Sequence, residues 1–343
     1  MTKEQSTIIK GIAILMMLWG HLFVDVDLVQ SLLNILPQIS GKPFAIWIKS
    51  IMTPVPFFLF LSGYGLYIVN MKPDGDKKRY RRVKHLYFVF LVVLLVFVPI
   101  SHIVRPNEYP GTLFKLLANI SGINPTYNTA MWFLLPYVLL ALSAKTIVGL
   151  LSKINAAFTL SIVYIVGIFV SWWISRHTVF LNSYRLIYIS LEYIALLTPF
   201  LFGMYTAKFK IFEGCKQYSL NHRWTSVAAV ISLMFIVFLK LSIKISVFTS
   251  FYTLIFIILF TIIKIPKTIE IPLKILGKYS MTMWMVHSYF YVVICPNFIY
   301  SFRTPLLIFA VLVSVSLLTS IIIQNIANYA YSYLSVRFVK LLC

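Results

Sequence analysis

Four ionisable side chains lie inside apolar stretches of this chain: Lys10, His21, Glu192 and His287. Placing an ionisable group within a membrane is costly, so such residues often mark a functional site. An imidazole can gain or lose a proton near neutral pH. Lysine can hold an anion. These residue types would suit acid–base chemistry on a negatively charged substrate.

Lys10 and His21 are 11 residues apart in one apolar stretch. At roughly 100° per residue they point the same way on a helix, about 16 Å apart along its axis. This spacing suits a substrate that is anionic near Lys10 and reactive near His21. The alternative is that Lys10 reaches lipid phosphates and His21 caps the helix end at the interface.

A basic cluster occupies Lys77–Lys84. If a helix begins here, Arg79 and Arg82 are three apart and share one face. Two guanidinium groups on one face make a good phosphate clamp. The alternative is that the cluster only sets the orientation of the chain in the membrane.

Composition assigns the chain to membrane proteins. Apolar residues make up 60% of 343 residues and charged residues 11%, whereas soluble domains carry about 25% charged residues. The net charge of +21 is explained by topology and anionic lipid rather than nucleic acid. The three cysteines fit neither a metal site nor a disulfide framework, and we expect no bound metal.

Hydropathy predicts an all-α, polytopic integral membrane bundle of about ten transmembrane helices, because each crossing needs about 20 mostly apolar residues. We expect one membrane domain over residues 1–343, with no appended soluble domain. The predicted spans are Ile8–Val24, Ile48–Val69, Leu86–Val104, Met131–Leu151, Ala156–Ile174, Leu186–Ala207, Trp224–Leu239, Ser246–Ile263, Ile275–Ile294 and Thr304–Ile326.

The orientation follows from the distribution of positive charge. The termini and the even-numbered loops carry 21 of the 30 Lys and Arg residues. Cytoplasmic segments are enriched in these residues. We therefore expect a multi-pass protein of the cell membrane with both termini in the cytoplasm.

Three segments between or at the ends of these spans carry expectations of their own. Leu28–Ile39 is too short to cross and reads as re-entrant or interfacial. Pro54 and Pro56 indicate that a helix starts or breaks there. Arg105–Ala130 is rich in Pro, Gly and Asn and is expected to be an extracytoplasmic loop.

Six segments, in order, resemble motifs of the membrane acyltransferase-3 family. Lys10 opens a segment similar to the family's Arg-Gly-(Ile/Leu)-Ala followed by Gly-His, with lysine in place of the usual arginine. Trp284 stands where the closing helix commonly has tyrosine. The six segments are Lys10–His21, Phe57–Tyr64, Arg79–Arg82, Met131–Leu134, Phe200–Met204 and Leu276–His287.

The resemblance implies transfer of an acyl group, usually acetyl, from cytoplasmic acyl-CoA to a hydroxyl of a surface or exported polysaccharide. Lys10, Arg79 and Arg82 would bind acyl-CoA, and His21 would be the general base. Acyl-CoA is then a co-substrate, and no permanently bound cofactor is expected. Asp25 either orients His21 or is a solvated loop acid.

Four further residues are candidates for the cavity: Ser62, Trp132, Glu192 and His287. Each has an alternative role: Ser62 in close helix packing, Trp132 as an interfacial anchor, Glu192 at the headgroups and His287 in structure. Expected partners are a glycan or lipid-linked glycan acceptor and membrane lipids. A homo-oligomer or association with polysaccharide-synthesis machinery is left open. The competing hypothesis is a transporter or flippase for a glycan or lipid-linked intermediate.

Overall fold

The computed structural model describes residues 1–24, 38–39, 42–221, 224–243 and 246–342. Helices dominate this part of the chain, and a two-residue antiparallel pair, β1 with β2, adds the only strands described. Asp25 and most of Leu28–Ile39 lie outside the described residues. The elements are α1 (Lys3–Leu22), β1 (Gln38–Ile39), β2 (Lys42–Pro43), α3 (Phe44–Lys49), α4 (Pro54–Asn70), α5 (Gly75–Val104), α6 (Leu113–Ile120), η1 (Thr129–Phe133), α7 (Leu134–Leu151), α8 (Ala156–Arg176), α9 (Thr178–Ser183), α10 (Arg185–Lys208), α11 (Ile211–Asn221), α12 (Thr225–Ser242), η2 (Ser246–Phe248), α13 (Thr249–Ile262), α14 (Lys267–Ser288), η3 (Tyr289–Ile294), α15 (Pro296–Tyr300) and α16 (Pro305–Leu342).

Seven helical segments in the described chain are long and apolar enough to cross a membrane. They are Phe44–Asn70, Gly75–Val104, Thr129–Leu151, Ala156–Arg176, Arg185–Lys208, Thr225–Ser242 and Pro305–Leu334. The all-helical membrane class is thus confirmed, but the count of about ten is not. The other three predicted spans are helical and fall short for different reasons: α13 has 14 residues, whereas α1 and α14 carry several polar and charged residues.

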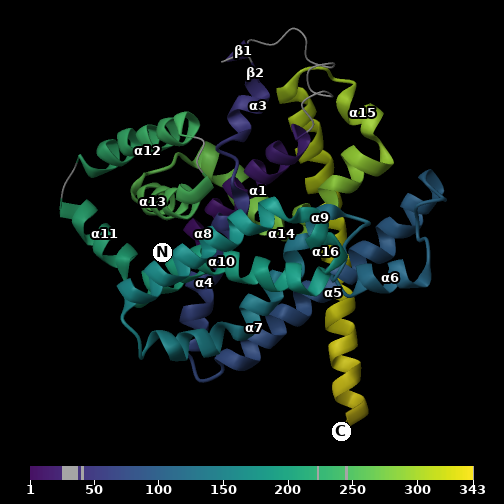
Figure 1. The fold of residues 1–343 in the computed structure, drawn as a ribbon, viewed down its shortest axis with the longest axis horizontal. Helices are drawn as coiled ribbons and strands as arrows, with labels where there is room; N and C mark the ends of the chain where they lie inside the picture. The colour runs from purple at the N-terminus through teal and green to yellow at the C-terminus, as the bar shows by residue number, and fades with distance from the viewer. Residues whose placement is uncertain (25–37, 40–41, 222–223, 244–245, 343) are drawn as a thin grey trace.

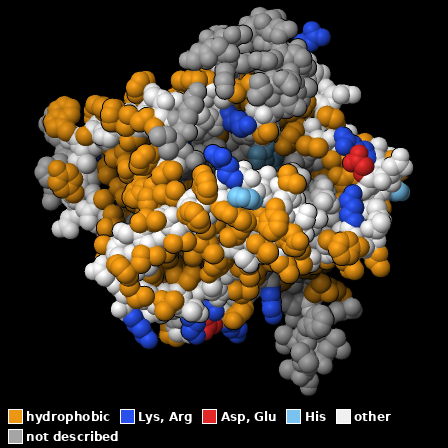
Figure 2. Space-filling view, viewed as in Figure 1, with side chains coloured by type: hydrophobic (Ala, Val, Ile, Leu, Met, Phe, Trp, Pro, Cys, Tyr) orange, Lys and Arg blue, Asp and Glu red, His pale blue; other side chains and the backbone are white. Residues whose placement is uncertain are grey.

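The surface has the character that lipid requires. Figure 2 shows hydrophobic side chains over much of the visible face, with Lys and Arg confined to a few places. Large apolar side chains such as Ile103, Phe114 and Phe169 are more than half exposed. In Figure 1, β1, β2, α3 and α15 lie at one end, the turn from α4 to α5 lies at the other, and α16 extends past the bundle.

Two helix pairs form the centre of the bundle, and each is packed through glycine. Gly277 of α14 lies so close to α1 that a Cβ there would be 1.8 Å from the carbonyl oxygen of Thr7. In the α4–α10 pair, a Cβ on Gly63 or Gly203 would be 2.0 Å from a backbone oxygen of the other helix. Such small residues let helix backbones meet within a membrane. The close packing that was the alternative role of Ser62 is found at its neighbour Gly63.

α1 is a single unbroken helix through the positions of Lys10 and His21. Thr2 and Gln5 form a capping box at its start, which satisfies two backbone N–H groups. Gly11 faces Leu273 of α14. Lys10 therefore lies immediately beside a helix contact that fixes its position.

Two local predictions have different outcomes. The helix start predicted at the paired prolines is confirmed, because α4 begins at Pro54. The prediction that Arg105–Ala130 is entirely loop is wrong. It contains α6, whose first turn is capped by the Thr112 hydroxyl accepting from the Lys115 N–H, and α6 exposes apolar Leu113 and Phe114.

Candidate active site

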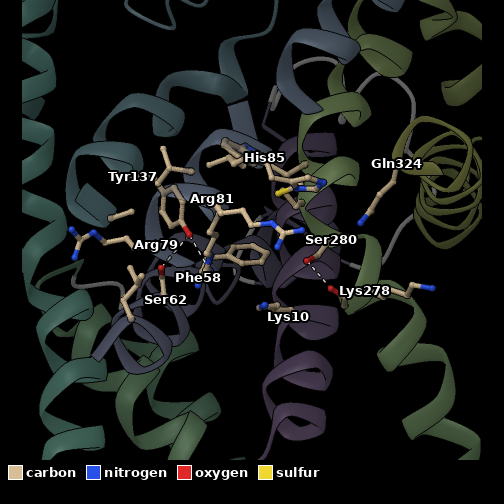
Figure 3. Close-up of a pocket in the computed structure, with 18 of the residues that line it drawn as sticks. Lys10, Phe58, Ser62, Arg79, Arg81, His85, Tyr137, Lys278, Ser280 and Gln324 are labelled. Atoms are coloured by element: carbon tan, nitrogen blue, oxygen red, sulfur yellow. Dashed lines mark hydrogen bonds between the residues drawn. The ribbon is translucent and has the colours of Figure 1, made fainter. Parts of the chain in front are cut away.

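A basic cavity of about 640 Å³ opens between α1, α4, α5, α7, α14 and α16. Figure 3 shows Lys10 of α1, Ser62 of α4, Tyr137 of α7 and Gln324 of α16 around it. Among the described residues that line it there is no Asp or Glu. Its six Lys and Arg side chains are Lys10, Lys78, Arg79, Arg81, Arg82 and Lys278.

Lys10 and Arg82 form no salt bridge within the described part of the chain. They are close enough to repel one another electrostatically. Arg82 Nη2 donates to the hydroxyl of Tyr137 at 3.1 Å, and the Ser62 hydroxyl donates to the same oxygen at 3.1 Å. Lys10 is half-buried and Arg82 is exposed, so both cations are available for charge-assisted contacts with an anionic ligand in the cavity.

Arg79 differs from Arg82 although both line the cavity. Its side chain is buried, with Nη1 donating to Asn70 Oδ1 at 2.8 Å and Nη2 paired with Asp76 at 2.9 Å. Lys78 is likewise paired, with Asp74 at 2.7 Å, and this contact lowers the pKa of the Asp74 carboxyl. Arg79 and Lys78 are therefore already paired with acidic side chains of the protein, unlike Lys10 and Arg82.

A second, histidine cavity of about 900 Å³ lies at the far end of α1. His21 lines it together with Trp132 of η1 and Tyr291 of the π-helical segment η3. Asn297 and Arg303 line it from α15 and the segment that follows. Lys10 and His21 thus belong to one helix but to two cavities.

His21 is paired with His287 of α14. His21 Nδ1 lies 2.7 Å from His287 Nε2, and the rings stack with centroids 4.9 Å apart. His287 Nδ1 is 2.9 Å from the carbonyl oxygen of Trp284. A carbonyl only accepts, so His287 carries its proton on Nδ1 and accepts on Nε2.

The tautomer of His21 follows from these partners. His21 must donate from Nδ1 to His287, which leaves His21 Nε2 as an unprotonated acceptor. A neutral imidazole oriented by a hydrogen bond at its other nitrogen is the arrangement that general-base catalysis requires.

The end of α14 is held in place by a buried polar cluster around Asn128. Asn128 Nδ2 donates to the carbonyl of Met285 at 2.7 Å, and its Oδ1 accepts from the Ser288 hydroxyl at 2.6 Å. The same oxygen accepts from the Ala130 N–H at 3.0 Å. His287 itself is fully buried. Beyond it the helix becomes π-helical in η3, a change that is frequent at functional sites.

The predicted site residues are therefore divided by the structure. Lys10, Ser62, Arg79 and Arg82 meet at the basic cavity, and His21 and Trp132 meet at the histidine cavity beside His287. Glu192 lines neither cavity, and its side chain hydrogen-bonds Tyr188 one helical turn away.

Three residues with a clear place in the site were not singled out from the sequence: Asn128, Tyr137 and Arg303. Tyr137 links Ser62 to Arg82, and Arg303 lines the histidine cavity. Asn128 lies four residues before Trp132 in a polar segment. A buried asparagine in such a segment leaves no periodic signal, so only the fold reveals its role.

These features define a class of protein: an integral membrane helical bundle with a cavity suited to anions and a separate cavity that contains an oriented histidine pair. The chain belongs to the acyltransferase-3 family, since that family's profile, described as an acyltransferase domain, matches residues 5–324. No curated protein and no solved structure matches it. The resemblance drawn from the six sequence segments is confirmed, and membership supports a transferase role.

Proposed function

We propose that this membrane acyltransferase transfers an acyl group, acetyl in the simplest case, from acyl-CoA to a hydroxyl of a glycan. Acyl-CoA would bind in the basic cavity with its phosphates near Lys10 and Arg82. The acceptor hydroxyl would enter the histidine cavity and meet His21. Family membership and the two cavities support this assignment.

The observation that carries the proposal is the unpaired positive charge in the basic cavity. Lys10 and Arg82 share a cavity that no described acidic side chain lines. Charge-assisted contacts from Lys and Arg to phosphate are strong. The donor of an acyltransferase is an activated ester, and acyl-CoA carries both that ester and several phosphates.

The chemistry balances with the residues in place. The acceptor oxygen attacks the carbonyl carbon of the thioester while its proton moves to His21 Nε2. The carbon–sulfur bond then breaks, and the CoA thiolate takes the proton from His21 to leave as the free thiol. His287 accepts from His21 Nδ1 throughout, so it keeps Nε2 directed to the reacting hydroxyl and stabilises the imidazolium.

The two cavities suit substrates that arrive from opposite sides of the membrane. The basic cavity lies by the α4–α5 turn, where the Lys and Arg bias predicts cytoplasm. The histidine cavity lies towards α15, on the side predicted to be extracytoplasmic. Trp132 provides an aromatic face for a sugar ring there. The protein would thus act in the cell membrane, with both termini cytoplasmic, on a polysaccharide or a lipid-linked glycan.

Donor binding is tested first, on purified protein in detergent. Equilibrium dialysis with labelled acetyl-CoA should give saturable binding that weakens in Arg82→Gln and Lys10→Met. Arg176→Gln, a change near the end of α8, is the matched control and should bind normally. Binding should also weaken at high salt. Equal binding by all four proteins would exclude the basic cavity as the donor site.

Transfer is tested second, by incubating the protein with labelled acetyl-CoA and a panel of candidate glycans. Wild type should label a glycan, and His21→Ala should not. His177→Ala is the matched control, because His177 is exposed and stacks on Trp173 away from both cavities. Normal transfer by folded His21→Ala would remove His21 as the base.

The same assay addresses the transporter hypothesis. A transporter would move a labelled glycan across proteoliposomes without consuming acetyl-CoA. Glycan movement in the absence of acyl-CoA, with no labelled ester, would favour transport over acyl transfer.

A further inference from the structure

Three side chains of the basic cavity lie within a few residues of the histidine cavity or of His287. Met17, Phe133 and Trp284 all line the basic cavity and are nearly buried, with exposed fractions of 3%, 5% and 6%. We name these three residues the partition. They come from α1, η1 and α14.

On α1 and η1 the lining changes from one cavity to the other within about one turn, and on α14 the partner of His21 follows the basic cavity just as closely. On α1, Met17 faces the basic cavity and His21, four residues later, the histidine cavity. On α14, Trp284 faces the basic cavity and His287, three residues later, bonds to His21. One helical turn rises about 5 Å, so the partition is about as thick as a single side-chain layer.

The same short distance is seen on η1, where Phe133 lines the basic cavity and Trp132 lines the histidine cavity. The partition is also well anchored. Trp284 Nε1 donates to the Ala130 carbonyl at 2.9 Å, and its ring packs edge-on against Phe133 with centroids 5.6 Å apart. These contacts hold the two aromatic side chains in place, and Ala130 itself lines the histidine cavity.

The acyl group is the leading end of acyl-CoA as it advances from the basic cavity. For the thioester carbonyl to come within reach of His21, the acyl group must first pass the partition. A straight chain presents the cross-section of one methylene, whereas a branched chain presents an extra methyl group. Inserting extra volume between close-packed side chains costs free energy, so passage of a branched chain is disfavoured.

We infer that Met17, Phe133 and Trp284 determine which acyl groups reach His21, by admitting straight short chains and rejecting branched ones. This inference rests on the proposed function, since it requires acyl-CoA as the donor. The backbone carbonyl oxygen of Trp284 also accepts from His287 Nδ1, so the partition adjoins the histidine pair. The side chain of Trp284 therefore belongs to the partition, and its backbone contacts the histidine that orients His21.

The experiment measures kcat/KM for acetyl-CoA and for isobutyryl-CoA in the same protein preparation. The ratio of the two values does not depend on the fraction of folded enzyme. Met17→Ala should raise the isobutyryl-to-acetyl ratio by roughly tenfold or more, the usual effect of about one methyl group in an apolar pocket. Phe133→Leu should act in the same direction, whereas Met17→Leu, which conserves volume, should leave the ratio unchanged.

Leu66→Ala is the matched control. Leu66 is also a buried apolar residue that lines the basic cavity, but it lies on α4, outside the partition. Its truncation should not change the ratio. The inference would be overturned if the ratio were unchanged in both Met17→Ala and Phe133→Leu, or if it rose equally in Leu66→Ala. In either case, acetyl transfer by the wild type would still uphold the proposed function. Absence of transfer from any acyl-CoA by wild type would instead reject the proposed function.

Discussion

Replacing His287 with alanine removes the atom that accepts the Nδ1 proton of His21. The Nδ1–Nε2 distance of 2.7 Å is that of a good hydrogen bond, and it becomes charge-assisted when His21 takes up the proton of the acceptor hydroxyl. Such a bond contributes about 1.5–3 kcal/mol. Since about 1.4 kcal/mol corresponds to tenfold in rate, kcat should fall roughly 10- to 150-fold.

The loss in His21→Ala should be larger, roughly 10²- to 10⁴-fold, because the general base itself is removed. The double variant should be no slower than His21→Ala alone, since His287 acts only through His21. His287→Gln should recover part of the rate, because the glutamine side-chain oxygen can accept from His21 Nδ1. The KM for acyl-CoA should change little in all of these variants.

The assay is acetyl transfer under saturating acetyl-CoA, expressed per folded protein from thermal melts in detergent. His287 is fully buried, so the alanine variant should also melt earlier, and the kinetic comparison must use temperatures below that transition. A greater loss in His287→Ala than in His21→Ala would identify His287 as the base. Additive losses in the double variant would show that the two histidines act independently.

Three further outcomes are expected. Arg82→Gln should raise the KM for acyl-CoA about tenfold, with a smaller effect at high salt. Arg79→Gln should instead lower the melting temperature, because both partners of the Arg79 side chain are within the protein. Gly277→Ala should destabilise the protein by about 3 kcal/mol through overpacking, while Gly149→Ala, with nothing within 4 Å of its Cβ, should not. A cysteine that replaces Asn107 should react with a membrane-impermeant thiol reagent added to the outside of intact cells.

Each of these outcomes has a result that contradicts it. If correctly inserted Arg82→Gln had a normal KM for acyl-CoA, the basic cluster Lys77–Lys84 would have a role only in setting the orientation of the chain in the membrane. Equal melting temperatures for Gly277→Ala and Gly149→Ala would mean that α1 and α14 are not in close contact. Labelling at Asn107 only after the membrane is permeabilised would reverse the orientation.

Patterns within single segments predicted a good part of the fold. Each predicted span overlaps a helix, because apolar stretches of this length leave few other structures in lipid. Placing Lys10 and His21 on one helix needed only the helical repeat. The helix start at Pro54 followed from the missing amide proton of proline.

Contacts between distant segments were not predictable in the same way. His21 and His287 are 266 residues apart, and no local pattern links them. Arg79 and Arg82 share a helix face in the sequence, yet Asp76 and Asn70 retain Arg79 inside the protein. Glu192 was a candidate because it is acidic in an apolar span, but its partner is a tyrosine on its own helix.

The glycine contacts described for the two central helix pairs constrain how this protein can move. Backbones that touch at Gly277 and at Gly63 cannot slide past one another without losing contact along their length, so each pair behaves as a rigid body. The basic cavity also borders the α5–α16 seam, where His85 and Asn328 meet through side chains at 2.8 Å. Loading of a large donor is therefore expected to displace α16 from α5 while α1 and α14 stay together. A disulfide across that seam should slow donor binding, and one between α1 and α14 should not.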